Sequence, residues 1–301
     1  MSYAAKVKEE IFASRPSKGK HYRAFCYGLL LLGKKFSEES ITISTEHISV
    51  SKLYGFAIKD SISKKAHFIE QRTPRGSALY TVELIDRDDI RRIMKYFSHD
   101  ETINMELIRD ENFQAFLCGA FMACGTVSEP QKGYHLELVV PDEELADILF
   151  MQLSSLGYPP KSMQRRGQTV LYYKESEQIE DILTMIGATH SSLELMETKI
   201  FKDIRNRANR AANCDAANAG KMLKAATQQL EDIKLLKEND KLNELTAQAV
   251  AVANLREHYP EASLSELSKL SGLSRSGINH RFGQISQAAA KLRAKQVNDD
   301  E

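Results

Sequence analysis

The sequence lacks any apolar run long enough to span a membrane and has no net charge. The longest apolar stretches, residues 24–33 and 116–125, are much shorter than the ~20 residues that a membrane-spanning helix needs. The N-terminal stretch has acidic residues where a signal peptide would have its apolar core. We therefore expect a cytoplasmic protein that has no contact with a membrane.

Metal-binding and disulfide patterns are also missing. None of the four cysteines forms a CxxC pair, and the eight histidines show neither HxxxH nor HExxH spacing. Cys26, Cys118, Cys124 and Cys214 all stand among apolar or small residues in helical contexts, which is typical of buried small side chains. The sequence predicts no metal, no cofactor and no disulfide framework.

The balance of 41 basic against 41 acidic residues hides an uneven distribution of charge. Residues 248–296 contain three acidic residues and seven basic ones, a net charge of +4; the basic residues are Arg256, Lys269, Arg275, Arg281, Lys291, Arg293 and Lys295. A small basic module on a neutral chain indicates a tethered DNA-binding domain, although a solvated basic face would have the same charge.

The first 190 residues show one order of elements twice, which indicates two related halves. An amphipathic helix at 3–15 comes first. Each half then has a buried helix, an alternating strand, a second helix, a hairpin and a third helix. These elements are expected at 21–33, 41–44, 46–62, 67–84 and 86–97, and again at 112–128, 135–140, 141–156, 162–175 and 176–187. Gly119 and Gly125 would let the two apolar helices approach closely.

Two short helices around a glycine are predicted at residues 262–285, ASLSELSKLSGLSRSGINHRFGQI. Ser263 and Glu266 have the spacing of a capping box, and Gly272 suits the turn. A second helix follows, with Ile278, Phe282 and Ile285 on its apolar face. The pattern is that of a helix-turn-helix whose second helix reads the major groove. The candidate DNA-binding residues are Ser274, Arg275, Ser276, Asn279, His280 and Arg281, because arginine pairs with guanine, asparagine with adenine, and serines at a helix start with phosphate. A helical interaction domain is the alternative.

A second polar motif, RNRANRAANCDAANAGK at 205–221, lies within a long helix predicted over 194–238. Asparagine is a poor helix former, so four of them in this stretch require a reason. The motif either touches DNA or another domain, or forms buried Asn–Arg hydrogen bonds at a domain junction. The residues concerned are Arg205, Asn206, Arg207, Arg210, Asn213, Asn218 and Lys221.

These two motifs, together with FLCGAFMACGTVSEPQKGYHLELVV in the second half, resemble the WhiA family of bacterial regulators linked to sporulation and cell division. The resemblance covers most of the chain. It implies an α+β protein with two LAGLIDADG homing-endonuclease-like halves of the αββαββα type, followed by an all-α helix-turn-helix domain. The expected divisions are 1–100, 108–197, a helical linker at 198–241, and a DNA-binding domain at 245–296.

The LAGLIDADG resemblance raises the question of nuclease activity. Such a nuclease needs an acidic residue near the end of each paired helix to hold a divalent metal that activates water. Here those positions are occupied by Leu32 and Cys124, and neither supplies the hard oxygen ligand that Mg²⁺ prefers. We therefore predict that the chain is not an enzyme.

The leading hypothesis is a sequence-specific regulator that binds double-stranded DNA on the nucleoid and acts in cell division, sporulation or chromosome organisation. A scaffold that binds a protein partner through residues 1–197 and uses DNA as an anchor is the second hypothesis, and an active nuclease is the third. Basic residues at both hairpins leave DNA contact by the two halves open, although exposed strands are commonly charged; they are Lys64, Lys65, Arg72, Arg75, Lys161, Arg165, Arg166 and Lys174.

Overall fold

The computed structural model describes residues 1–74, 76–99 and 102–299, with side chains as far as Lys295. The chain divides into two compact units, Met1–Lys202 and Asp203–Glu301, and each has its own hydrophobic core. The boundary lies inside a single helix, α8 (Thr189–Glu238). Arg75, one of the basic residues at the first hairpin, lies outside the described residues.

The first unit contains the order αββαββα twice, which confirms the expected pair of LAGLIDADG-like halves. An additional helix, α1 (Tyr3–Ser14), precedes them. The first half consists of α2 (Gly19–Leu31), β1 (Lys35–Phe36), β2 (Ile41–Thr45), α3 (Ile48–Ile62), β3 (His67–Arg72), β4 (Ala78–Leu84) and α4 (Arg87–Phe97). The second consists of α5 (Phe113–Cys124), β5 (Gly125–Val127), β6 (Leu136–Val140), α6 (Glu143–Ser155), β7 (Lys161–Arg165), β8 (Gln168–Tyr173) and α7 (Ser176–Met185).

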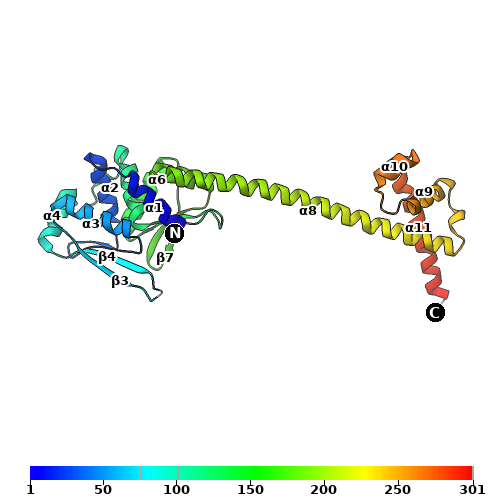
Figure 1. The fold of residues 1–301 in the computed structure, drawn as a ribbon, viewed down its shortest axis with the longest axis horizontal. Coiled ribbons are helices and arrows are strands. Elements are labelled where there is room, and N and C mark those ends of the chain that lie inside the picture. The colour runs from blue at the N-terminus through cyan, green and yellow to red at the C-terminus, as the bar shows by residue number, and fades with distance from the viewer. Residues whose placement is uncertain (75, 100–101, 300–301) are drawn as a thin grey trace. The chain divides into compact units, whose positions relative to one another are not determined.

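Each half forms a four-stranded antiparallel sheet, with the equivalent orders β1-β2-β4-β3 and β5-β6-β8-β7. The helices of this unit lie on one side of the sheets, which leaves the hairpin strands uncovered on the other (Figure 1). The expected helix at 112–128 was too long, because the backbone becomes extended at Gly125 and residues 125–127 pair with β6. Strands of two or three residues are too short to show an alternating pattern, so the sequence did not reveal β1 or β5.

Helices α2 and α5 pack against each other through one glycine from each helix. A Cβ atom added to Gly28 would lie 2.2 Å from the carbonyl oxygen of Phe116, and one added to Gly119 would lie 2.0 Å from that of Phe25. Only glycine permits this backbone approach. The prediction for Gly119 is therefore confirmed. That for Gly125 is wrong, because an added Cβ there would meet the ring of Phe121 in its own half.

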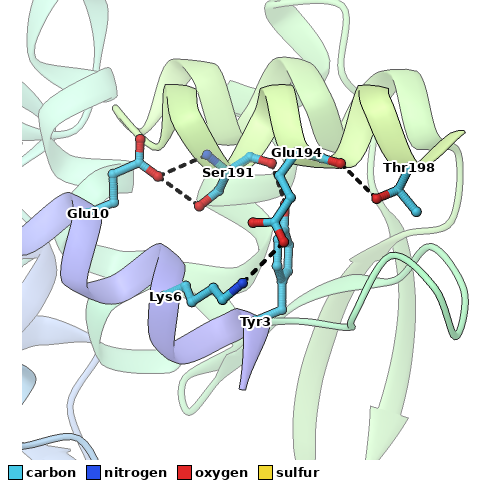
Figure 2. Close-up of polar contacts among 6 residues, drawn as sticks. All are labelled: Tyr3, Lys6, Glu10, Ser191, Glu194 and Thr198. Carbon is cyan, nitrogen blue, oxygen red and sulfur yellow. Dashed lines mark hydrogen bonds and ion pairs between the residues drawn. The ribbon is translucent and has the colours of Figure 1, made fainter. Parts of the chain in front are cut away.

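Helix α1 is fastened to the start of α8 by polar contacts along one of its faces (Figure 2). Glu10 accepts hydrogen bonds from the Ser191 amide (3.0 Å) and the Ser191 hydroxyl (2.7 Å). Lys6 forms an ion pair with Glu194 at 3.2 Å, and the Tyr3 hydroxyl donates to the Ser191 carbonyl. A carboxylate at a helix N-terminus is favourable, because the free amides and the helix dipole both attract negative charge. These contacts fix the position and rotation of α1.

The second unit is entirely helical. After the C-terminal part of α8 come a short 3₁₀ turn (Leu242–Glu244), α9 (Ala247–His258), α10 (Leu264–Ser271) and α11 (Arg275–Asp299). Its core joins α8, α9, α10 and α11; the buried residues are Ile233, Leu236, Leu242, Ala249, Val252, Ala253, Leu267, Ile278, Phe282, Ile285 and Ala289. Among the described residues of the chain, no helix combines the length and the apolar character required to span a lipid bilayer.

Candidate nucleic-acid interface

The helix-turn-helix of the second unit consists of α10, a turn at Gly272 and α11. The Ser263 hydroxyl and the Glu266 carboxylate cap each other's backbone amides at the start of α10, as the capping-box spacing predicts. Gly272 ends α10 with a φ of 70°, in the left-handed region that glycine adopts most easily. The Ser274 hydroxyl then accepts a hydrogen bond from the Gly277 amide at 3.1 Å and caps α11. Local sequence signals thus account for the whole motif.

The first turns of α11 present a polar surface on the side opposite to their buried residues. Ile278 and Phe282 face the core. The predicted DNA-binding residues Ser274, Arg275, Ser276, Asn279 and His280 are all exposed on the other side, and we call these five residues the α11 surface. It has the hydrogen-bond donors and acceptors required to contact base edges and phosphates.

Arg281 differs from the other predicted base readers. Its side chain is half-buried and donates a hydrogen bond to the Gln248 Oε1 atom of α9. The expectation that it is freely exposed on the reading helix is wrong. The helical spacing explains this partial burial. Arg281 lies three residues after Ile278 and four before Ile285, so it is placed at the edge of the buried face of α11.

Two more basic residues of this module have structural partners. Arg256 is only 2% exposed; it donates to Gln229 Oε1 (3.0 Å) and to the carbonyl oxygens of Tyr259, Pro260 and Ala262. Burial lowers its pKa. Arg293 donates to the Asp232 carboxylate at 2.6 Å. The net charge of +4 therefore overstates the charge available to DNA. The sequence did contain a signal that Arg256 is buried, because this residue lies on the same helical face as Ala249, Val252 and Ala253.

The polar motif of α8 is exposed along its length. Every candidate residue in it, from Arg205 to Lys221, is solvent-exposed, and the described contacts include no Asn–Arg hydrogen bond. The one side-chain hydrogen bond is a long one, from Asn218 to the Cys214 sulfur at 3.6 Å. The expectation of buried Asn–Arg pairs at a junction is wrong for these residues, whereas contact with an external partner stays a prediction.

A cleft of about 520 Å³ brings the end of this motif to the helix-turn-helix. Asn218 and Lys221 lie on the α8 side, Ser263 and Ser265 at the start of α10, and Arg275 at the start of α11. Three cations, Lys221, Arg275 and the buried Arg256, and two helix N-termini thus line one opening within the second unit. This combination suits an anionic group such as a phosphate.

The basic residues at the two hairpins of the first unit are partly neutralised. Arg165 donates to both oxygens of Glu137, at 2.8 and 3.0 Å, and His135 lies 3.1 Å from the same carboxylate. Although burial alone would raise the pKa of Glu137, these hydrogen bonds lower it. In the other half, Lys64 lies 4.0 Å from Asp89. The sheets therefore keep less free positive charge than the sequence indicated.

The ends of α2 and α5 do not fit the divalent metal of a LAGLIDADG nuclease. Leu32 is 2% exposed and has no ligand atom. Burial raises the pKa of the Cys124 thiol to about 12, so this group stays neutral at pH 7. The described part of the chain contains no group of three His, Cys, Asp or Glu side chains that could hold a metal ion. The Cys124 thiol interacts electrostatically with Lys8 of α1, an ammonium that would repel a metal cation.

Sequence reasoning did not identify Lys8, Gln248 or Gln229 as partners in these sites. Each lies on a different helix from the residue it affects, so no local pattern connects them. Lys8 stands beside Val7 and four residues after Ala4 on the buried side of α1, and a lysine at that position was the one available signal.

Comparison with known proteins agrees with both units. Residues 113–205 match the family model of the WhiA LAGLIDADG-like domain, and residues 208–289 match that of the WhiA C-terminal HTH domain. A probable cell division protein WhiA of Clostridium novyi is 32% identical, over 97% of this chain and 99% of its own length. The Clostridium tetani protein of the same name is 30% identical, over 97% and 98%.

Solved structures show the same fold. Full-length DUF199/WhiA from Thermatoga maritima matches with a TM-score of 0.57 at 22% identity, covering 97% of this chain and 99% of that one. The isolated N-terminal LAGLIDADG domain of DUF199/WhiA matches with a TM-score of 0.50 at 17% identity, over 61% and 89%. Taken with the curated relatives and the two domain models, these similarities establish that the chain belongs to the WhiA family.

Proposed function

We propose that this protein is a sequence-specific DNA-binding regulator that acts in cell division and has no nuclease activity. The observation that carries the proposal is the α11 surface, where Arg275, Asn279 and His280 are exposed together at the start of the second helix of the motif. In helix-turn-helix proteins this part of the helix contacts base edges in the major groove. DNA binding would keep the protein on the nucleoid.

Phosphate contacts would come from the cleft beside the α11 surface. Lys221 and Asn218 on one side and the N-terminus of α10 on the other would hold the DNA backbone while α11 reads the groove. This gives the polar motif of α8 a role that its exposure supports. A protein partner for residues 1–197 stays a prediction, and a pull-down with the full-length protein would address it.

The role in cell division rests on the names of the relatives, which are called probable cell division proteins. The absence of nuclease activity rests on Leu32 and Cys124, which cannot hold a divalent metal. A plasmid-nicking assay with Mg²⁺ and with Mn²⁺ tests the second point. Cleavage by the purified protein would contradict it.

The DNA proposal is tested by measuring binding to a genomic duplex and to a random duplex over a range of salt concentrations. Arg275→Ala should weaken binding to the genomic site and reduce the difference between the two duplexes, if this arginine reads a base. Lys291→Ala removes an equal charge from an exposed position further along α11 and is the matched control. Equal effects of the two variants would argue against base reading by Arg275.

A further inference from the structure

Lys8 is a buried lysine in a fixed position. The contacts of Tyr3, Lys6 and Glu10 with the start of α8 lie on one face of α1 (Figure 2). At 100° per residue, Lys8 projects from the opposite side, toward the body of the first unit. There α1 contacts α3, α5 and β5. Lys8 is only 6% exposed, so its side chain is enclosed by these elements.

No acceptor for the Lys8 ammonium is found among the described residues, either as a hydrogen bond or as an ion pair. The Nζ atom of Lys8 is not fully enclosed and keeps some access to solvent. A buried charge without a partner is costly, and proteins normally pair such groups. Lys8 therefore carries a largely buried charge that an anion from solvent can still reach.

The groups near Lys8 do not supply that anion. The Cys124 thiol interacts with it electrostatically, but burial raises the pKa of this thiol to about 12. His47, which precedes α3, is also close, and burial together with the charge of Lys8 lowers its pKa. Both groups are thus neutral near pH 7, and neither compensates the positive charge of Lys8.

The Lys8 ammonium interacts with the end of α5, and this location indicates which anion it could bind. Cys124 is the last residue of α5, and the LAGLIDADG motif predicts that its position corresponds to a metal-binding carboxylate of such a nuclease. In such a nuclease the metal lies next to the phosphate of the strand that is cut. Here a cation carried by the chain itself stands beside the lost carboxylate position. It could attract a phosphate, but it cannot activate water as a metal does.

We propose that Lys8 binds a backbone phosphate of duplex DNA at the end of α5, which makes the former nuclease site a non-cleaving phosphate anchor. This inference rests on the proposed DNA-binding function, but it concerns a different unit and different residues. A free phosphate ion has the same chemistry, so the experiment must separate the two sources.

The test compares the full-length protein with Lys8→Met and Lys6→Met. Both variants lose one positive charge from α1, but Lys6 is an exposed residue paired with Glu194. Methionine fills the space of the lysine stem and removes a buried charge, so Lys8→Met should fold. Affinity for a duplex is measured by fluorescence anisotropy as a function of salt. One lost phosphate contact should reduce the salt slope by about 0.9, with roughly a tenfold loss of affinity at low salt.

Lys8→Met should show this loss and Lys6→Met should not. Inorganic phosphate, added at constant ionic strength, should compete with duplex for the wild type only weakly. Equal behaviour of the two variants overturns the inference and leaves DNA binding by α11 intact. A wild type that binds no duplex overturns both. If inorganic phosphate raises the unfolding temperature of the wild type but not of Lys8→Met, while their DNA binding is equal, the site takes a free anion and the assignment to DNA is wrong.

Discussion

Among the described residues, each of the two units buries one cationic side chain, and the two differ in the partners that they have. Arg256 in the second unit is 2% exposed and has four acceptors, one side-chain oxygen and three carbonyl oxygens. Lys8 in the first unit is 6% exposed and has no hydrogen-bond or ion-pair partner among the described residues. The guanidinium also lies 5.4 Å from the centre of the Phe282 ring.

The difference separates a structural cation from a functional candidate. Arg256 holds the loop between α9 and α10, because it donates hydrogen bonds to the carbonyl oxygens of Pro260 and Ala262 in that loop. Lys8 stabilises nothing that is visible in its surroundings and reduces the stability of the fold by burying its charge. A largely buried lysine that lacks a partner and interacts with Cys124 at the end of α5 is better explained by a ligand than by packing.

The largest effect is expected from Arg256→Met. The change keeps much of the side-chain volume but removes every hydrogen bond of the guanidinium, so it should destabilise the second unit by about 3 kcal/mol or more. Urea unfolding followed by circular dichroism measures this. Arg210→Met, at an exposed position of α8, is the control and should change little. A loss of less than about 1 kcal/mol would show that the four contacts are not a structural clamp.

The Lys8→Met variant should be more stable than the wild type, in contrast to Arg256→Met, and its effect on the free energy of unfolding should depend on pH. Burial lowers its pKa to about 8 in the folded protein, below the value of about 10.4 in an unfolded chain. Between these values the unfolded state binds more protons, so the free energy of unfolding should rise with pH from 8 to 10.4, by on the order of 3 kcal/mol. Lys8→Met should lack this rise and be more stable than the wild type at pH 7. Because burial also raises the pKa of tyrosines such as Tyr27, the measured quantity is the difference between wild type and variant. Parallel curves would mean that Lys8 is well solvated.

Arg281 is intermediate between these two cases, because it has one acceptor on Gln248 while its Nε atom is buried without a partner. Arg281→Ala should therefore lower stability by about 1 kcal/mol and change DNA affinity little. Arg275→Ala should do the reverse and weaken binding by about 1–3 kcal/mol if it reads a guanine. Anisotropy titrations and urea unfolding of both variants would decide between them. A stronger binding loss for Arg281→Ala would restore it as the principal base reader.

The smallest effect is expected from Lys6→Met. Lys6 is exposed and Glu194 is partly exposed, and an ion pair that water screens contributes little. Stability should change by less than about 0.5 kcal/mol. A larger loss, measured by thermal unfolding, would show that α1 depends on this pair to hold Lys8 in place.

Much of the architecture could be predicted from residue patterns. The repeated order of elements, the capping box at Ser263 and the turn at Gly272 depend on contacts within a few residues, so local sequence determines them. The hairpin turn at Arg166-Gly167 belongs to the same class, since both residues have positive φ angles, as a two-residue hairpin requires. The assignment of Leu32 and Cys124 to the lost acid positions rests on the motif alone and stays a prediction.

Only the tertiary structure decided which charged residues are available. The sequence analysis included Arg256, Arg281 and Arg293 in the positive charge available to DNA. In the structure, each of them donates a hydrogen bond to a residue on another helix; these residues are Gln229, Gln248 and Asp232. It also placed Lys8 on an amphipathic helix without revealing that α1 packs beside the end of α5. A charge is free or engaged according to what lies within a few ångströms of it, and the fold brings those atoms together from positions up to 61 residues apart in the second unit and further in the first. Sequence periodicity specifies the face of a helix, whereas the neighbour on that face is a property of the folded chain.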